Sequence, residues 1–145
     1  MMSILITGVN GLVGVYTAKI LLDEGFEVVG YDTNQSGELA LFPEIADRIT
    51  FVWGDISQLP HLLETVEKYG VKHIIHLAGL RNEVLFKQMP VELFRVNLQG
   101  MLNVLELARL KKIERVIFAS SAAVYGKMDD PGQRPLTCPV LCSEP

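Results

Sequence analysis

Three glycines spaced three residues apart, Gly8, Gly11 and Gly14, form the most informative motif of this sequence. They follow the short apolar run Ile4–Ile6 and precede a segment whose apolar residues recur at helical spacing. A glycine turn between a strand and a helix lets backbone approach a phosphate closely, and the N–H groups at the helix start can bind the anion. Asp32 lies 18 residues after Gly14, close to the ~20 expected for a ribose-binding carboxylate. The spacing therefore predicts a dinucleotide site, with a turn of packing glycines as the alternative.

The composition is that of an ordinary globular domain. With 145 residues, of which 49% are hydrophobic and 21% charged, the chain can build one hydrophobic core. A net charge of −4 provides no general basic field, so we expect no nucleic-acid partner. No apolar stretch approaches the ~20 residues of a membrane span, and no targeting segment precedes the first strand, so we expect no membrane partner and a cytoplasmic location. Cys138 and Cys142 lie four residues apart without a following histidine, so we expect no metal site.

Strand-like and helix-like segments alternate along the chain. The expected strands are residues 4–6, 27–31, 49–53, 73–77 and 115–119. The expected helices are residues 12–24, a short one near 39–42, one capped by Ser57 that runs to about Gly70, and a long one at 90–111. The apolar face expected on the long helix consists of Leu93, Phe94, Asn97, Met101, Val104, Leu105 and Ala108. Because strands such as Val116–Phe118 are continuously apolar, the fold class predicted is α/β, a Rossmann-type doubly wound parallel sheet that ends after about its fifth strand.

Glycine and polar motifs come at the carboxyl ends of all these strands, where such sheets bind ligands. The motifs are Thr7-Gly8-x-x-Gly11-x-x-Gly14, Asp32, Gly54-Asp55-Ile56, His76-Leu77-Ala78-Gly79 and Ser120-Ser121-Ala122-Ala123-Val124-Tyr125-Gly126. Together with Asn97 in the long helix, they resemble the extended short-chain dehydrogenase/reductases, and within them the NAD-dependent nucleotide-sugar epimerase/dehydratase family. The resemblance extends from Ser3 to about Gly126.

The resemblance implies NAD as cofactor and assigns it a set of contacts. The pyrophosphate would lie on the glycine turn, at Gly8, Asn10, Gly11, Leu12, Val13 and Gly14. Asp32 would bind the adenosine ribose, and a carboxylate there without a following arginine favours NAD over NADP. Asp55 and Ile56 would bind the adenine edge, although Asp55 could instead be a turn residue that caps the next helix.

The middle of the cofactor would be lined by Leu77, Ala78 and Gly79. Arg81 follows where a cation could reach a phosphate, but it could equally be a solvated loop residue. Asn97 is expected on the buried face of its helix, where its amide needs a partner, either at the site or on a neighbouring backbone. His76 is expected to be a strand residue with a satisfied ring.

Ser121 matches the catalytic Ser/Thr of the family, which hydrogen-bonds the substrate oxygen at the carbon that exchanges hydride. The two residues that follow are Ala122 and Ala123, where related 4,6-dehydratases carry an Asp and a Glu for acid–base chemistry, so dehydration by that route is not expected. The Tyr-x-x-x-Lys pair that supplies the general base in the family is absent from these 145 residues.

The expected organisation is an NAD-binding Rossmann domain at 1–126 and a Pro-rich loop or tail at 127–145, without the C-terminal substrate domain of the family. The longer protein would act on a nucleotide sugar and form a homodimer. We expect the 145-residue chain itself to be inactive; a non-catalytic NAD-binding or oligomerisation module is the alternative.

Overall fold

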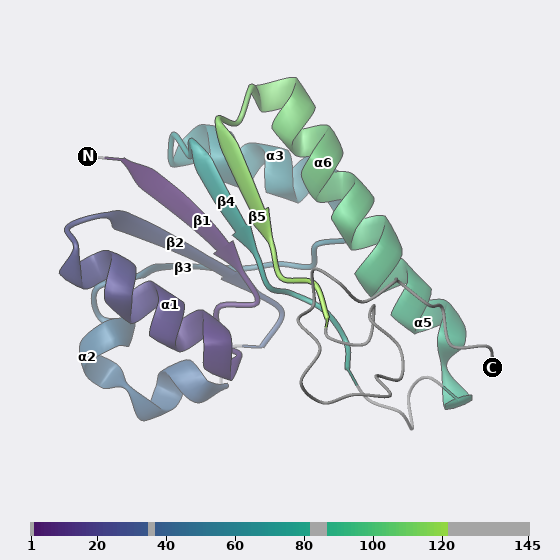
Figure 1. Cartoon of the computed structure of the whole chain (residues 1–145), viewed down its shortest axis with the longest axis horizontal. Helices are drawn as coiled ribbons and strands as arrows, with labels where there is room; N and C mark the ends of the chain where they lie inside the picture. Colours follow the sequence, from purple (N-terminus) through teal and green to yellow (C-terminus); the bar gives the residue numbers. More distant parts are fainter. Residues whose placement is uncertain (1, 35–36, 82–86, 122–145) are drawn as a thin grey trace, which may run out of the picture.

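A five-stranded parallel sheet organises the chain (Figure 1). The computed structural model describes residues 2–34, 37–81 and 87–121. The strands are β1 (Ser3–Thr7), β2 (Glu27–Asp32), β3 (Thr50–Trp53), β4 (His73–His76) and β5 (Arg115–Phe118). Their order in the sheet is β3-β2-β1-β4-β5, and each neighbouring pair is parallel. This order confirms the doubly wound sheet predicted from the sequence.

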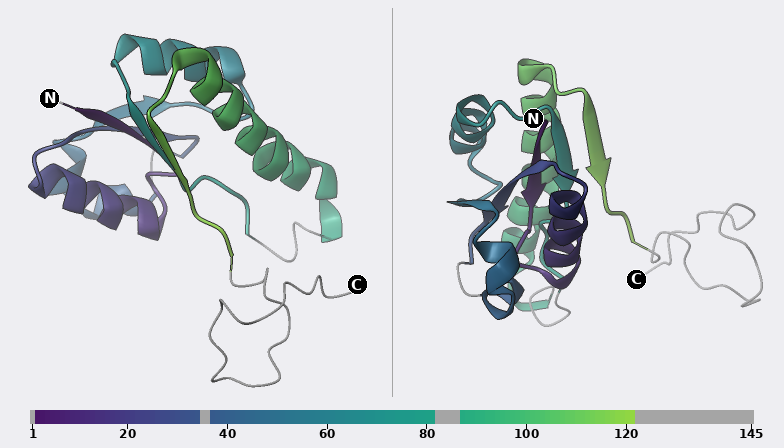
Figure 2. Two further views of the ribbon diagram at one scale, coloured as in Figure 1. Left: turned by 45° about the horizontal axis from the view of Figure 1, so that its top comes forward. Right: turned by 90° about the vertical axis from the view of Figure 1, so that its left-hand side faces the viewer.

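The helices lie in two layers, one on each face of the sheet (Figure 2). They are α1 (Leu12–Asp23), η1 (Glu38–Leu41), α2 (Pro43–Ala46), α3 (Leu59–Lys68), α5 (Pro90–Phe94), η2 (Arg95–Gln99) and α6 (Gly100–Lys111). The last three follow one another without a break, so the long helix predicted at 90–111 is present and contains a π-helical turn at η2.

Alternate residues of the strands supply the two cores. On one face, Leu5 and Tyr31 pack with Leu62 of α3 and Leu107 of α6. On the other face, the cluster contains Ile6 of β1, and side chains of α1, η1 and α2. Because successive strand residues point to opposite faces, a strand buried on both sides must be apolar throughout, as β1 is.

The long helix buries only part of the face predicted for it, since Leu93 and Val104 are buried as expected but other members are not. Phe94, Asn97 and Leu105 are exposed. The buried positions are Leu93, Gly100, Asn103, Val104 and Leu107. The helix carries apolar residues on both sides, so periodicity alone could not decide which side packs inward.

The start of α3 also differs from the prediction. The N-cap residue is Gln58, not Ser57, and it makes no side-chain cap bond. The Ser57 hydroxyl instead accepts a hydrogen bond from Arg95 of η2. Pro60 lies in the first turn of the helix, as expected, where its missing N–H costs nothing.

Over the ranges 2–34, 37–81 and 87–121, no helix has both the length and the hydropathy needed to cross a membrane. The predicted Pro-rich tail at 127–145, with Cys138 and Cys142, lies outside the described residues, as do Ala122 and Ala123.

Candidate functional site

The carboxyl ends of β1 and β4 are neighbours at the point where the strand order reverses. Thr7 Oγ1 accepts a hydrogen bond from the Ala78 N–H at 3.3 Å and lies 2.6 Å from His76 Nδ1. A neutral imidazole can accept the Thr7 hydroxyl proton at Nδ1 or donate from Nδ1 to Thr7 Oγ1, according to its tautomer. Burial lowers the pKa of His76 to about 4, which favours that neutral form. His76 is therefore a bonded strand residue that ties β1 to the segment after β4, as the sequence indicated.

The three glycines of the turn meet different surroundings. Gly8 has φ +73°, and a Cβ there would lie 2.7 Å from the Ala78 nitrogen. A Cβ at Gly14 would collide with the Gly8 carbonyl and lie 2.7 Å from Val9 Cα. At Gly11, the nearest described atom to such a Cβ is the Gly8 carbonyl oxygen, at 3.4 Å. Close contact with neighbouring backbone therefore requires glycine at positions 8 and 14, whereas the described protein atoms leave open space beside Gly11.

Gly11 is also the N-cap of α1, which begins directly above the turn. It has no side chain with which to cap the helix, and the Val15 N–H takes its carbonyl as the first helical bond. The amides of Leu12, Val13 and Gly14 precede that bond and have no partner within the helix. The side chains of Leu12 and Val13 are exposed, and the first turn carries no acidic residue. This helix start therefore offers N–H groups and a favourable dipole end to an anion.

The Asp32 carboxylate lies beside the same turn, at the end of β2. Its Oδ2 accepts the Asn10 backbone N–H at 2.9 Å, and its Oδ1 accepts the Asn34 N–H at 3.0 Å. The Asn10 side chain is buried and donates from Nδ2 to the Asn34 carbonyl, while its Oδ1 has no hydrogen-bond partner among the described residues. Asp32 is half-buried, so its remaining lone pairs can accept hydroxyl donors from a ligand.

Asp55 follows β3, and both of its carboxylate oxygens have partners. Oδ1 accepts the Ser57 N–H at 2.8 Å, and Oδ2 accepts Arg95 Nη1 at 2.8 Å. Partial burial alone would raise the pKa of Asp55, but these hydrogen bonds outweigh it and hold the pKa below its usual range. The Ser57 contact makes Asp55 a turn residue, as the alternative held, but Asp55 does not cap α3, whose N-cap is Gln58. Ile56 is buried, and its carbonyl accepts Asn103 Nδ2 at 2.9 Å.

The segment after β4 runs along the long helix. Asn97 holds Leu80 from both sides: its Oδ1 accepts the Leu80 N–H at 2.8 Å and its Nδ2 donates to the Leu80 carbonyl at 2.9 Å. The prediction that Asn97 is buried was wrong, and its amide satisfies a neighbouring backbone. Of the other residues assigned here, Leu77 and Ala78 are half-buried, and Gly79 and Arg81 are exposed.

Ser121 is exposed and comes three residues after the end of β5, on the same side of the sheet as the motifs above. The residues that follow it, including Tyr125, lie outside the described part of the chain. The structure thus brings the glycine turn, Asp32 and the Thr7–Ala78 contact together around the end of β1.

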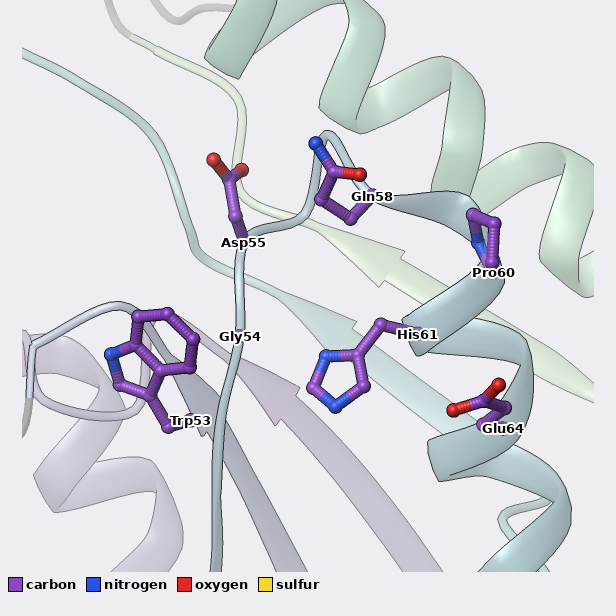
Figure 3. Close-up of a pocket in the computed structure, with 7 residues that line it drawn as sticks. All are labelled: Trp53, Gly54, Asp55, Gln58, Pro60, His61 and Glu64. Carbon is purple, nitrogen blue, oxygen red and sulfur yellow. The ribbon is translucent and has the colours of Figure 1, made fainter.

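A cavity of about 430 Å³ opens where β3 ends and α3 begins (Figure 3). It is lined by Trp53, Gly54, Asp55, Gln58, Pro60, His61 and Glu64. Tyr31 contacts two of the lining residues, because its hydroxyl lies 2.9 Å from His61 Nδ1 and a Cβ at Gly54 would collide with its ring. The Asp55 carboxylate is turned away from Trp53 and His61 in Figure 3. The lining of the cavity contains Asp55 but no residue of the glycine turn.

Two residues at the site had no role in the sequence interpretation. Arg95 and Asn103 reach the loop after β3 from the long helix, and Gln99 supports Asn103 through a 2.8 Å bond from Nε2 to Oδ1. They lie at 95, 99 and 103, four residues apart and therefore on one side of the helix. This is the signal that could have identified them.

Comparison with known proteins places this geometry in a family. The model of the NAD dependent epimerase/dehydratase family matches residues 4–141. A UDP-glucose 4-epimerase of Klebsiella pneumoniae is 32% identical over 129 residues, which are 86% of this chain and 93% of that one. A UDP-glucose 4-epimerase of Yersinia enterocolitica is 37% identical over 130 residues, 87% of this chain and 39% of that protein.

Solved structures agree. The UDP-glucose 4-epimerase of Brucella ovis, crystallised in complex with NAD, superimposes with a TM-score of 0.79 at 32% identity, over 90% of this chain and 39% of that one. The chain thus spans about two fifths of the length of the Yersinia and Brucella proteins. On the match over most of its length and on its sheet order, the chain belongs to the NAD-dependent epimerase/dehydratase family.

Proposed function

We propose that this chain binds NAD and forms the cofactor-binding part of an oxidoreductase that acts on nucleotide sugars. The observation that carries the proposal is the open position beside Gly11, at the start of α1, next to a turn in which the Asn10 N–H holds the Asp32 carboxylate at 2.9 Å. In an adenosine diphosphate, the pyrophosphate is an anion that suits the amides, and the ribose hydroxyls are donors that suit the carboxylate.

The pyrophosphate contacts come from backbone. The N–H groups of Leu12, Val13 and Gly14 would hold it, and Gly11 would let it approach. Asn10 supports the site, because its backbone N–H donates to Asp32 Oδ2 and its Nδ2 donates to the Asn34 carbonyl. Gly8 contributes by allowing the turn to pack on Ala78.

The two ends of the cofactor take the remaining residues. Asp32 would accept the ribose hydroxyls, and Asp55 with the Ile56 N–H would meet the adenine edge. Leu77, Ala78 and Gly79 would line the middle, while Arg81 is free to reach a phosphate from its exposed position. Asn97 would support the site indirectly, because its amide holds the Leu80 backbone next to the residues that line the middle of the cofactor.

NAD, when bound, supplies a nicotinamide ring that can accept a hydride from a carbinol carbon of the substrate. Ser121 would hold the reacting oxygen of that substrate. Since a hydroxyl of ordinary pKa is a poor base at neutral pH, and Tyr-x-x-x-Lys is missing from these 145 residues, we propose that the chain alone does not turn over. The relatives named UDP-glucose 4-epimerase support a UDP-sugar as the substrate of the longer protein.

A second candidate function is a non-catalytic NAD-binding or oligomerisation module. An apolar stripe on the outer side of the long helix favours it, because it offers a surface for association: Val91, Phe94, Leu98, Leu102 and Leu105 are all exposed. In either case we propose a cytoplasmic protein that forms a homodimer.

Calorimetric titration of the chain with NAD and with NADP tests the cofactor assignment. We expect NAD to bind at least about tenfold more tightly, because the Asp32 carboxylate repels a 2′-phosphate and Thr33 and Asn34 offer it no cation. The Asp32→Ala variant should lose most of that preference. Equal or tighter binding of NADP by the unaltered chain would overturn the assignment.

A further inference from the structure

The loop Asp55–Ser57 is held in place by the long helix. Arg95 Nη1 donates to Asp55 Oδ2 at 2.8 Å and also to the Ser57 hydroxyl. Eight residues further along the helix, Asn103 Nδ2 donates to the Ile56 carbonyl at 2.9 Å. Gly100 lets the helix come close, because a Cβ there would collide with the Ile56 side chain. The loop is thus attached at all three of its residues.

The guanidinium of Arg95 is itself held in one orientation. Its Nε donates to Glu92 Oε2 at 2.9 Å and its Nη2 to Glu92 Oε1 at 2.6 Å. This two-point pair fixes the plane of the fork and leaves Nη1 for the loop. The π-helical turn η2 begins at Arg95, and such turns are frequent at functional sites.

These contacts fix the orientation of the Asp55 carboxylate. Ser57 takes one lone pair of Oδ1, and Arg95 takes one of Oδ2. Each oxygen retains acceptor capacity, and the two bonds fix the direction in which that capacity points. The same two bonds hold the pKa of Asp55 low, so the group stays an acceptor over the neutral range. A fixed, ionised acceptor distinguishes an amine from a carbonyl in a ligand, because the carbonyl oxygen would face it without a proton.

We propose that Arg95 is a positioning residue for base recognition, which orients the Asp55 carboxylate toward an exocyclic amine and so makes the site prefer an adenine over a hypoxanthine dinucleotide. The inference rests on the proposed function, since it requires the adenine end of NAD to lie at Asp55.

Titration with two dinucleotides tests the inference. NAD and nicotinamide hypoxanthine dinucleotide differ in whether the base carries an amine or a carbonyl oxygen. The unaltered 145-residue chain should bind NAD about tenfold or more tightly than the hypoxanthine form, as expected for one lost hydrogen bond to a charged acceptor. The Arg95→Met variant should bring the ratio of the two dissociation constants to within about twofold of one, by weakening NAD more than its analogue.

Arg109 supplies a matched control on the same helix. It pairs with Glu106 as Arg95 pairs with Glu92, with Nε–Oε2 at 2.8 Å and Nη2–Oε1 at 2.6 Å, but it is exposed on α6. Arg109→Met should keep the tenfold ratio. Arg95→Lys keeps the charge without the fork and should give an intermediate ratio. This variant also keeps the test decisive if Arg95→Met fails to fold, which a thermal melt reports.

The outcomes separate this inference from the proposed function. If the unaltered chain binds neither dinucleotide, the proposed function fails and the role of Arg95 fails with it. If the unaltered chain binds NAD with the expected preference, but both Arg95 variants lose affinity equally for the two dinucleotides, Arg95 is merely structural and only this inference is overturned.

Discussion

The ring of Phe118 stacks on the imidazole of His76, with the ring centroids 5.7 Å apart and an interplanar angle of 24°. The contact joins β5 to β4 at the end where Thr7 also meets His76. It helps to explain why a group that could carry a charge stays neutral, since one face of the imidazole is covered by an apolar ring and Nδ1 is hydrogen-bonded to Thr7 Oγ1.

This burial predicts a loss of stability in mild acid. The pKa of His76 is about 4 in the folded chain and 6.5 when unfolded, so the unfolded state binds the extra proton between these values. The free energy of unfolding therefore carries no penalty from His76 above pH 6.5, and it decreases as the pH falls from 6.5 toward 4. The pKa difference corresponds to about 3 kcal/mol.

Urea unfolding at pH 7.5, 5.5 and 4.5 measures the effect. The His76→Gln variant keeps an acceptor for Thr7 but cannot titrate, so its free energy of unfolding should fall less over this range than that of the unaltered chain. If the free energy of unfolding fell equally with pH in the two proteins, His76 would not be the cause of the loss of stability in acid.

The glycine turn predicts a separation of binding from folding. Gly11→Val should keep the thermal stability of the chain, because the nearest described atom to a new Cβ is 3.4 Å away. It should weaken NAD binding by roughly two orders of magnitude or more, since bonds from backbone amides to a charged phosphate contribute about 1.5–3 kcal/mol each.

Gly14→Ala is the matched control for folding. Its Cβ would strike the Gly8 carbonyl, so we expect destabilisation of about 1–3 kcal/mol. Thermal melts and calorimetry on both variants check the contrast. A Gly11→Val chain with the NAD affinity of the unaltered protein would make the turn a packing feature alone.

Self-association is expected through the outer side of the long helix. Val91, Phe94, Leu98, Leu102 and Leu105 recur at helical spacing and are all exposed, and a second copy of the same helix is the partner we expect for such a stripe. Light scattering after size exclusion should show a concentration-dependent dimer. The double variant Phe94→Glu, Leu98→Glu should be monomeric.

Leu41 on η1 supplies the control, because it is 71% exposed but lies among the elements of the opposite sheet face. Leu41→Glu should leave the dimer unchanged. Association that survives the double variant would point to the open edge of β5, where Ile117 and Phe118 are exposed, and not to the helix.

The 145-residue chain should show no turnover of UDP-glucose in the presence of NAD. Ser121 can orient a substrate oxygen, but the sequence contains no Tyr-x-x-x-Lys to take its proton. A coupled assay for epimerised product checks this. Turnover that disappears in Ser121→Ala would show that another group of this chain acts as the base.

The fold could be predicted from the sequence because its signals are local. The strands 4–6, 27–31 and 49–53 lie within one residue or two of β1, β2 and β3, since continuous apolar runs bounded by glycine and polar residues leave few other structures. The glycine turn could also be predicted from the sequence, because Gly8 has a positive φ that other residues rarely adopt.

The sequence by itself determined which chemistry gathers at one edge of the sheet. In a parallel sheet all strands end on the same side, so Asp32, Asp55 and the residues after β4 had to meet there. It did not determine how those groups are supported. Asn97 was expected to be buried and is exposed, and Ser57 was expected to cap α3 and instead meets Arg95.

Only the tertiary structure decided which side of the long helix packs inward, and with it the partners of the Asp55 loop. The helix is apolar on both sides, so its rotation is set by how Val104 and Leu107 fit against the sheet and α3. That rotation brings Arg95 and Asn103 onto the loop after β3, some 40 residues or more away in the chain. The four-residue spacing of 95, 99 and 103 places these side chains on one side of the helix but does not indicate which loop they contact, because that depends on the distance between two elements and not on the order of residues within either one.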